Sequence, residues 1–197
     1  MAVVEPLGED EMEPRLRAEV QFFKGPLGVV PNSVRTMAHR PEIARAFTAL
    51  NVAVMTCHGA VSPEFKRLLG YVTSFVSGCR YCQAHTILGA ERFGAAPERL
   101  ESVWDFEDSP HFTQAEKAAL AFAHAAAEVP NGVTPEIAAR LRAHWSDGDI
   151  VEIMGVVALF GYLNRWNDSM GSALEDLPVA AAEAHLGATG WSVGKHR

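Results

Sequence analysis

The sequence predicts an all-α fold, because helical periodicity recurs along the chain and signals for strands are nearly absent. Apolar residues repeat at three- and four-residue steps between Phe65 and Val76, as on the buried face of an amphipathic helix. No sustained alternation of apolar and polar residues occurs, and no hairpin dipeptide separates two β-branched runs. Helix caps, prolines and glycines divide the chain into successive helices.

Helix boundaries in the first half follow from local capping signals. One helix is expected over residues 41–56. Ser62 followed by a proline is typical of an N-cap and a first helical turn, and it predicts a helix that ends at Gly78. A further helix is expected from Arg80 to Phe93, because the next residue is a glycine.

The second half carries similar signals. Thr113 and Glu116 match a capping box that opens the alanine-rich run 117–128. Thr134 followed by a proline opens another helix, and the helical pattern continues over residues 149–163. A weak internal repeat at an offset of 85 residues aligns the stretch 79–82 with 164–167, which would imply a duplicated helix pair.

None of the breaks between helices resembles a long flexible linker, so one compact domain is expected. We expect an N-terminal extension over residues 1–27 with a helix that packs on the core, a main domain over 28–175, and a C-terminal segment over 176–197. The first dozen residues and the tail from about Thr189 are poor core material, and they are expected to fray or to pack on a partner.

The 197-residue chain has a globular composition, with 48% hydrophobic and 21% charged residues. Its 17 Lys and Arg residues against 24 Asp and Glu give a net charge of −7, which argues against a nucleic-acid partner. The apolar stretches are interrupted well before the ~20 residues that span a bilayer, so no membrane partner is expected. The acidic start of the chain has the wrong charge for a targeting segment, and a cytoplasmic protein is expected.

The motif Cys79-x-x-Cys82 carries the clearest chemistry. Cys79 follows a helix-breaking glycine, so it lies near a helix N-terminus, where unpaired amides and the macrodipole favour a thiolate. Cys82 lies one turn further along the same face, close enough to bridge Cys79. His85 comes one turn after Cys82, where its imidazole could accept the thiol proton. This set suits peroxide reduction through a sulfenic acid and then an intramolecular disulfide.

A zinc site is the lesser interpretation of the same residues. It would use Cys79, Cys82 and His85, with Cys57 or His58 as a further ligand. Ligands on one helix give poor tetrahedral geometry, because structural zinc sites usually draw on two separated pairs. We therefore expect neither a metal nor an organic cofactor.

The stretch from Cys79 to His85 resembles the carboxymuconolactone decarboxylase and alkylhydroperoxidase (AhpD-like) superfamily, in particular its peroxidase-related branch. The likeness covers roughly residues 28–175. The further segments that carry it are Gly28–Asn32, His39–Glu42, Ala115–Leu120, Pro130–Val133, Trp145–Ile150 and Asn164–Asp168.

The resemblance implies an AhpD-like helical fold that assembles as a homo-oligomer, commonly a trimer or hexamer, with active sites near subunit contacts. It also implies reduction of a small hydroperoxide. Cys82 would be the peroxidatic cysteine, and Cys79 would resolve it and exchange with a thiol or a lipoyl-bearing protein as reductant. The histidine of the relatives matches His85.

The sequence departs from the family pattern at two places. Many members place the histidine one residue later, where this chain has Thr86. The family glutamate twelve residues before the first cysteine aligns with Arg67, so the carboxylate that would orient the histidine is missing. Glu64 lies one helical turn from Arg67, and Glu152 holds the equivalent place in the second copy of the internal repeat. The sequence assigns the role to neither of them.

Two other functions remain open from the sequence. One is a lyase that acts on a lactone acid, as the superfamily name allows, although such members do not need the cysteine pair. The other is a non-catalytic oligomeric module, in which Cys79 and Cys82 bind a metal or form a redox-sensing bridge.

Overall fold

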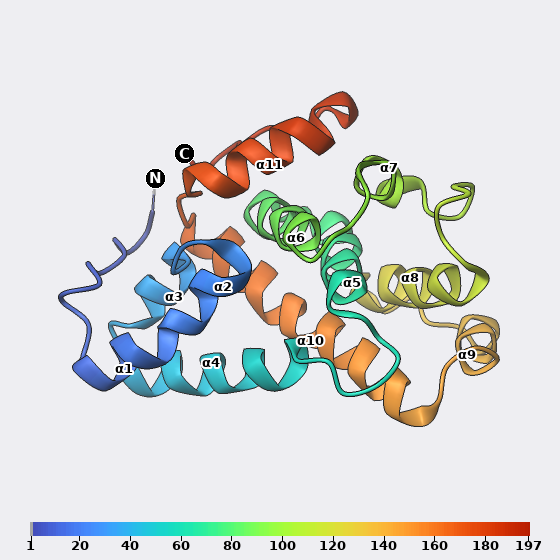
Figure 1. The fold of residues 1–197 in the computed structure, drawn as a ribbon, viewed down its shortest axis with the longest axis horizontal. Coiled ribbons are helices and arrows are strands. Elements are labelled where there is room, and N and C mark those ends of the chain that lie inside the picture. Colours follow the sequence, from blue (N-terminus) through green and yellow to red (C-terminus); the bar gives the residue numbers. More distant parts are fainter. Residues whose placement is uncertain (1) are drawn as a thin grey trace.

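The computed structural model describes residues 2–197, and within that range the chain is helical and contains no strand, which confirms the all-α prediction (Figure 1). The α-helices are α1 (Pro14–Glu19), α2 (Lys24–Leu27), α3 (Asn32–Met37), α4 (Pro41–Met55), α5 (Pro63–Val76), α6 (Arg80–Arg92), α7 (Pro97–Ser102), α8 (Gln114–Ala127), α9 (Pro135–Arg142), α10 (Asp147–Met170) and α11 (Asp176–Leu186). Short 3₁₀ segments follow α1, α7 and α11.

Helices α5 and α6 form the centre of the molecule and pack against each other most extensively (Figure 1). The long helix α10 crosses both of them on one side, and α11 lies along α6 on the other. Helix α4 packs against α10, whereas α8 packs against α5. The start of α6, which carries the cysteine motif, is therefore enclosed between α5, α10 and α11.

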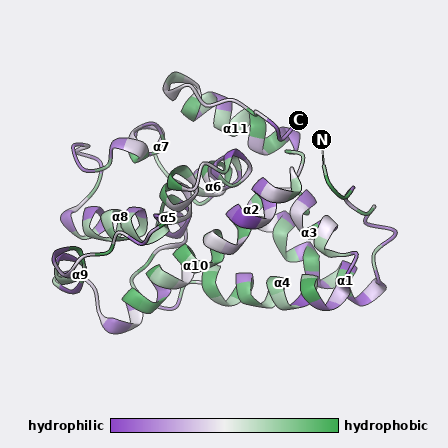
Figure 2. Ribbon diagram, turned by 180° about the vertical axis from the view of Figure 1, so that it is seen from behind, coloured by the Kyte–Doolittle hydropathy of each residue, from purple (hydrophilic) through white to green (hydrophobic). Residues whose placement is uncertain are grey.

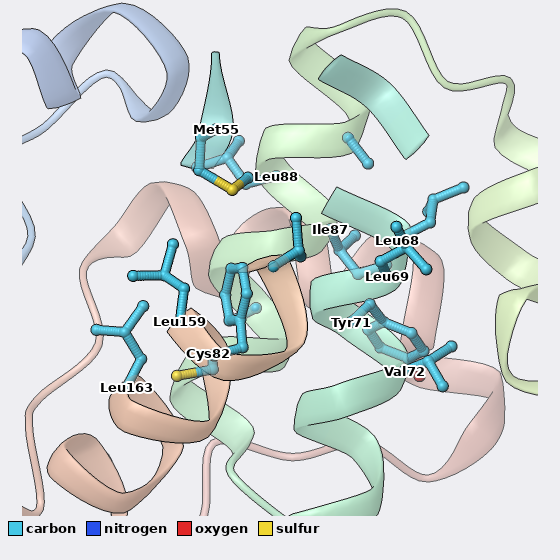
Figure 3. Packing of buried hydrophobic residues seen from close by; sticks show 14 of the residues in the cluster. Met55, Leu68, Leu69, Tyr71, Val72, Cys82, Ile87, Leu88, Leu159 and Leu163 are labelled. Atoms are coloured by element: carbon cyan, nitrogen blue, oxygen red, sulfur yellow. The ribbon is translucent and has the colours of Figure 1, made fainter. Parts of the chain in front are cut away.

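The core at this centre is built by apolar side chains from α5, α6 and α10. Figure 3 shows Leu68 and Leu69 of α5 beside Ile87 of α6, with Leu159 of α10 on the opposite side. All four side chains are buried. The backbones of α5 and α10 approach closely at Gly70, where an added Cβ would lie 2.5 Å from the ring of Phe160. A larger residue than glycine would push α10 away from α5.

The capping signals read from the sequence are confirmed. The Ser62 hydroxyl accepts a hydrogen bond from the N–H of Phe65 at 3.1 Å, and α5 begins there. The Thr113 side chain accepts from the N–H of Glu116 while the Glu116 carboxylate accepts from the N–H of Thr113, so the capping box at α8 is complete. Each reciprocal contact satisfies an N–H group that the helix itself cannot pair.

The expected helix over 149–163 is longer than the sequence pattern indicated. Ser146 forms a capping box with Asp149, which starts α10 at Asp147, and Gly171 in a left-handed conformation ends it. The helix has 24 residues and no break that corresponds to Gly78. The repeated stretch is therefore one continuous helix and not a second helix pair.

Both ends of the chain contribute to the core. Met12 and Leu16 are buried, and so are Trp191 and His196 in the tail that was expected to be poor core material. The tail is fixed because the His196 carbonyl accepts a hydrogen bond from the N–H of Leu174 at 2.8 Å. Figure 2 shows hydrophobic residues along α4 and α10. No helix within residues 2–197 combines the length and apolar character needed to cross a membrane.

Candidate active site

The two cysteines of the motif lie where α6 begins. Gly78 has a φ of +72°, and this left-handed turn ends α5 and places Cys79 at the N-cap of α6. Cys82 follows in the first turn of the helix, and Figure 3 shows its sulfur directed toward α10 near Leu163. Both thiols are free and buried.

The surroundings of the two thiols favour ionisation of Cys79. A hydrogen bond from the Cys82 thiol lowers the pKa of Cys79, and the backbone N–H groups of Cys82 and Tyr81 add to this effect against the cost of burial. Burial raises the pKa of Cys82 well above its usual value, and its hydrogen bond to Cys79 acts in the same direction. In the reduced protein Cys79 is therefore the better thiolate, and Cys82 is the thiol that donates to it.

A buried amide of α10 also contacts the Cys82 sulfur. The Nδ2 group of Asn167 donates a hydrogen bond to Sγ of Cys82 at 3.4 Å. The Oδ1 atom of Asn167 accepts from the hydroxyl of Ser172 at 2.9 Å, which fixes the orientation of the amide. Burial dominates the raised pKa of Cys82, and the Asn167 hydrogen bond opposes it. The amide thus stabilises negative charge on Cys82 whenever that sulfur loses its proton.

The imidazole of His85 is held at both ring nitrogens. Its Nδ1 donates to the carbonyl oxygen of Tyr81 at 3.1 Å, and its Nε2 lies 3.0 Å from Oε2 of Glu175. The Tyr81 carbonyl can only accept, so Nδ1 carries a proton, and Nε2 faces the Glu175 carboxylate. The ring also stacks on the Tyr81 ring, with the centroids 4.3 Å apart.

Glu175 binds three groups from separate parts of the chain. Besides the His85 contact, its Oε1 accepts from the Tyr81 hydroxyl at 3.1 Å and from the backbone N–H of Asn32. Burial by itself would raise the pKa of Glu175, but the charge of His85 and the hydrogen bonds from His85 and Asn32 lower it overall. The carboxylate is therefore ionised at neutral pH, and its Oε2 atom faces the His85 ring.

The contacts of His85 differ from those that the sequence-based interpretation expected. Within residues 2–197 the ring nitrogens of His85 contact Tyr81 and Glu175, and not the Cys82 sulfur. The role of His85 as a proton acceptor for Cys82 therefore stays a prediction, and the neighbouring thiol that influences Cys82 is Cys79.

The two carboxylates considered from the sequence lie elsewhere. Glu64 pairs with the guanidinium of Arg99 at 3.0 Å, and Glu152 pairs with Nζ of Lys66 at 2.7 Å. The carboxylate that orients His85 is Glu175, which comes from the start of α11. Sequence reasoning missed it because its local pattern indicates only a helix start, whereas its role depends on α11 packing against α6.

A cavity of about 80 Å³ adjoins the Cys82 thiol. Its wall is mostly apolar and comes from α2, α4, α6 and α10, with Phe23, Leu27, Phe47, Met55, Phe160 and Leu163 among the lining residues. The polar groups that reach it include Cys82, His85 and Asn167. Cys79 does not line this cavity, so an apolar substrate there meets the second cysteine of the motif first.

Cys79 and Cys82 together form a buried dithiol site. No group of three or more His, Cys, Asp or Glu residues in the part of the chain that the structure describes is arranged to hold a metal ion. Cys57, considered from the sequence as a further ligand, is exposed in the loop after α4 and donates to the Gly59 carbonyl at 3.4 Å. The buried thiols can deliver two electrons to a small molecule in the cavity and form a disulfide.

The fold and the site together define a class of all-helical proteins with a Cys-x-x-Cys motif at the start of a central helix. Residues 41–125 match the model of the carboxymuconolactone decarboxylase family. The chain is 30% identical to the debrominase Bmp8 in its crystal structure, with a TM-score of 0.87, covering 92% of this chain and 97% of that one. A variant of Bmp8 has been crystallised with 2,3,4-tribromopyrrole.

Two further relatives support the same grouping. A peroxidase-related protein from Ralstonia eutropha JMP134, described as an alkylhydroperoxidase AhpD core, shares the fold at 22% identity and a TM-score of 0.77. It covers 90% of this chain, and the match spans 96% of that one. The uncharacterized protein YnjA of Escherichia coli (strain K12) is 32% identical over 93 residues, which span 47% of this chain and 50% of that relative. The chain therefore spans about half the length of this curated relative. The chain belongs to the carboxymuconolactone decarboxylase family.

Proposed function

We propose that this protein is a dithiol-dependent reductase whose substrate is a small hydroperoxide. The observation that carries the proposal is the position of Cys82, which lines an apolar cavity while Cys79 lies one helical turn behind it, at the N-cap of α6. His85 lines the same cavity. An apolar wall favours an organic hydroperoxide over hydrogen peroxide, because the organic group gains from burial.

The reaction would proceed in two displacement steps. The Cys82 sulfur attacks the terminal oxygen of the hydroperoxide, so that an S–O bond forms, the O–O bond breaks and an alcohol leaves. Cys79 then attacks the Cys82 sulfenic acid, so that an S–S bond forms and water leaves. Two thiols and one hydroperoxide thus give a disulfide, an alcohol and water. An external dithiol restores the two thiols.

The protons in the first step have defined sources. The Cys79 thiolate accepts the proton of Cys82 as the Cys82 sulfur attacks. The Asn167 amide, which donates to Cys82, stabilises the charge that develops on that sulfur. In this proposal His85, held by Glu175, is the proton donor to the leaving alkoxide.

The partners proposed for this reaction follow the family resemblance. A thiol or a lipoyl-bearing protein would be the reductant, and a cytoplasmic homo-oligomer, such as a trimer or hexamer, would be the working form. Because both sulfurs are buried in the single chain, a protein reductant needs a local opening near the start of α6 to reach Cys79.

Reductive dehalogenation of a small aromatic halide is the second candidate. Two observations favour it: the likeness to the debrominase over nearly the whole chain, and the apolar lining of the cavity beside Cys82. The electron balance is the same, because two thiols would exchange a carbon–halogen bond for a carbon–hydrogen bond. The products would be a halide ion and the Cys79–Cys82 disulfide.

The experiment supplies dithiothreitol as reductant and compares tert-butyl hydroperoxide with 2,3,4-tribromopyrrole as substrates. Turnover of the hydroperoxide that is abolished in Cys82→Ser and retained in Cys57→Ser supports the first candidate. Bromide release with the same dependence on Cys82 favours the second. Equal turnover in wild type and Cys82→Ser would overturn both, since each requires the Cys82 sulfur to attack.

A further inference from the structure

Arg67 reaches the cavity beside Cys82 from α5 and is 6% exposed. Its side chain passes over the backbone of α6 at Gly89, where an added Cβ would lie 3.0 Å from Cγ of Arg67. The guanidinium carbon then lies 4.0 Å from the centroid of the Phe93 ring. The cation is thus held at a fixed place on the wall of the cavity, between α6 and the aromatic ring.

This guanidinium has no carboxylate partner among residues 2–197. Its hydrogen bond there is from Nη1 to the Pro63 carbonyl, one turn back in α5, at 2.7 Å. Burial lowers the pKa of Arg67 to about 10, so the side chain is still charged at neutral pH. The edge formed by Nε and Nη2 remains free to donate.

Two other shielded cations near this cation are paired with carboxylates. Lys66, the neighbour of Arg67 in sequence, is fully buried and binds Glu152 at 2.7 Å as well as two backbone carbonyls. Arg99 binds both Glu64 and Glu116. A buried charge without a counterion is costly, because burial removes its hydration and nothing replaces it. An unpaired guanidinium in a cavity wall is therefore a candidate binding group.

We propose that Arg67 binds the anionic group of the substrate, so that the natural substrate is an elongated, mostly apolar molecule with a carboxylate at the end far from its reactive group. This inference rests on the proposed function only in taking the cavity beside Cys82 as the substrate site. The free Nε–Nη2 edge matches the two oxygens of a carboxylate, which guanidinium groups bind with paired hydrogen bonds.

The geometry of α6 sets the orientation and length of such a molecule. Cys82 and Gly89 are separated by seven residues of one helix, and a rise of about 1.5 Å per residue places them about 10 Å apart. The reactive group would lie at Cys82 and the carboxylate at Arg67.

The test measures binding of unreactive ligands, so it does not depend on turnover. Isothermal titration calorimetry compares hexanoate, octanoate and decanoate with the corresponding neutral amides, using the reduced wild-type protein. At least one acid is expected to bind about tenfold more tightly than its amide, which is the effect of one charge-assisted contact. Equal binding of acid and amide along the whole series, or no binding of either, would overturn the proposal.

Variants assign the preference to Arg67. Arg67→Gln is expected to lose the preference for acid over amide, whereas Arg67→Lys retains part of it. Arg140→Gln removes a surface guanidinium that pairs with Glu107 and is the matched control, with the preference unchanged. A preference that survives in Arg67→Gln would overturn the assignment. If Arg67→Gln fails to fold, the comparison of acid with amide in wild type and Arg67→Lys still decides the outcome.

The outcomes separate this inference from the proposed function. An acid preference that depends on Arg67, in a protein that consumes neither tert-butyl hydroperoxide nor 2,3,4-tribromopyrrole, supports the anion site and contradicts the proposed chemistry. Cys82-dependent turnover of tert-butyl hydroperoxide without an acid preference supports the chemistry and contradicts the anion site.

Discussion

Nε2 of His85 lies 3.0 Å from Oε2 of Glu175, and this contact joins the central helix α6 to the start of α11. The carboxylate comes from the C-terminal part of the chain and also binds Tyr81 and the backbone of Asn32. The site is therefore completed by segments far apart in the sequence. The position that the family pattern reserves for a carboxylate holds Arg67, which lines the same cavity.

Replacing Glu175 removes the carboxylate that orients His85. In Glu175→Gln we expect Cys82-dependent turnover to fall by about 10²-fold, the usual contribution of a positioned acid. The pH profile of turnover discriminates this role from a structural one, because loss of a positioned proton donor changes the shape of the profile, whereas a loss of folded protein lowers turnover at every pH. Asp176→Asn, one residue along, is the control and should behave as wild type.

The same carboxylate also predicts how stability depends on pH. The pKa of Glu175 is lowered in the folded protein, so its contribution is fully present above the unfolded value of about 4.3 and is lost as pH falls through the folded value. Urea unfolding of wild type and Glu175→Gln should show a difference in free energy that shrinks below about pH 4. A difference that grows on acidification would contradict the ion pair.

The Asn167 amide is expected to assist Cys82 by donating to its sulfur. Asn167→Leu removes this donor, so the pKa of Cys82 should rise further and attack by Cys82 should slow. Alkylation by iodoacetamide, followed residue by residue with mass spectrometry across a pH series, measures the ionisation of each cysteine. Ser172→Ala leaves the amide in place but frees its orientation, and a smaller effect is expected. An unchanged alkylation profile at Cys82 in Asn167→Leu would exclude this role.

The two thiols should ionise in a defined order. The pKa of Cys79 is lowered and that of Cys82 is raised in the folded protein. Iodoacetamide should therefore modify Cys79 at a lower pH than Cys82 under native conditions. Cys82→Ser retains a hydrogen-bond donor at this position, and Cys82→Ala removes it, so the pKa of Cys79 should rise most in Cys82→Ala. Prior ionisation of Cys82 would instead place the thiolate on the cavity side.

Two glycines test the packing of α5 against α10. Gly70→Ala is expected to destabilise the protein by about 1–3 kcal/mol, because the new methyl group would overlap the Phe160 ring. Gly161 lies in α10 with no neighbour within 4 Å of an added Cβ, so Gly161→Ala should be neutral or stabilise by up to about 1 kcal/mol. Urea unfolding measures both values. Equal effects of the two substitutions would contradict the close approach at Gly70.

The helices and the cysteine motif could be predicted from the sequence because local physics determines them. Ser62 caps α5 and Thr113 caps α8 through contacts within one turn. The place of Cys79 at the start of α6 follows from Gly78, because a glycine adopts the left-handed turn there without strain. The full length of α10 was not predicted. The expected helix covered residues 149–163, whereas α10 runs over Asp147–Met170.

The contacts that tune the site could not be predicted, because they depend on tertiary packing. Glu175 and Asn167 reach the motif from α11 and α10, and neither carries a local signal of that role. The internal repeat aligned Asn167 with Cys82 as equivalent positions, which gives no reason to expect them in contact. Arg67 was recognised as a departure from the family pattern, but its lack of a counterion appears only in the folded structure.

The most direct measurement of the central claim is a single turnover of the fully reduced protein with tert-butyl hydroperoxide, without added reductant. The account predicts that each molecule of tert-butanol formed consumes two thiols, and that peptide mapping finds a bond between Cys79 and Cys82 while Cys57 stays free. Alcohol formed without loss of these thiols, or no alcohol formed while the thiols remain reduced, would contradict it.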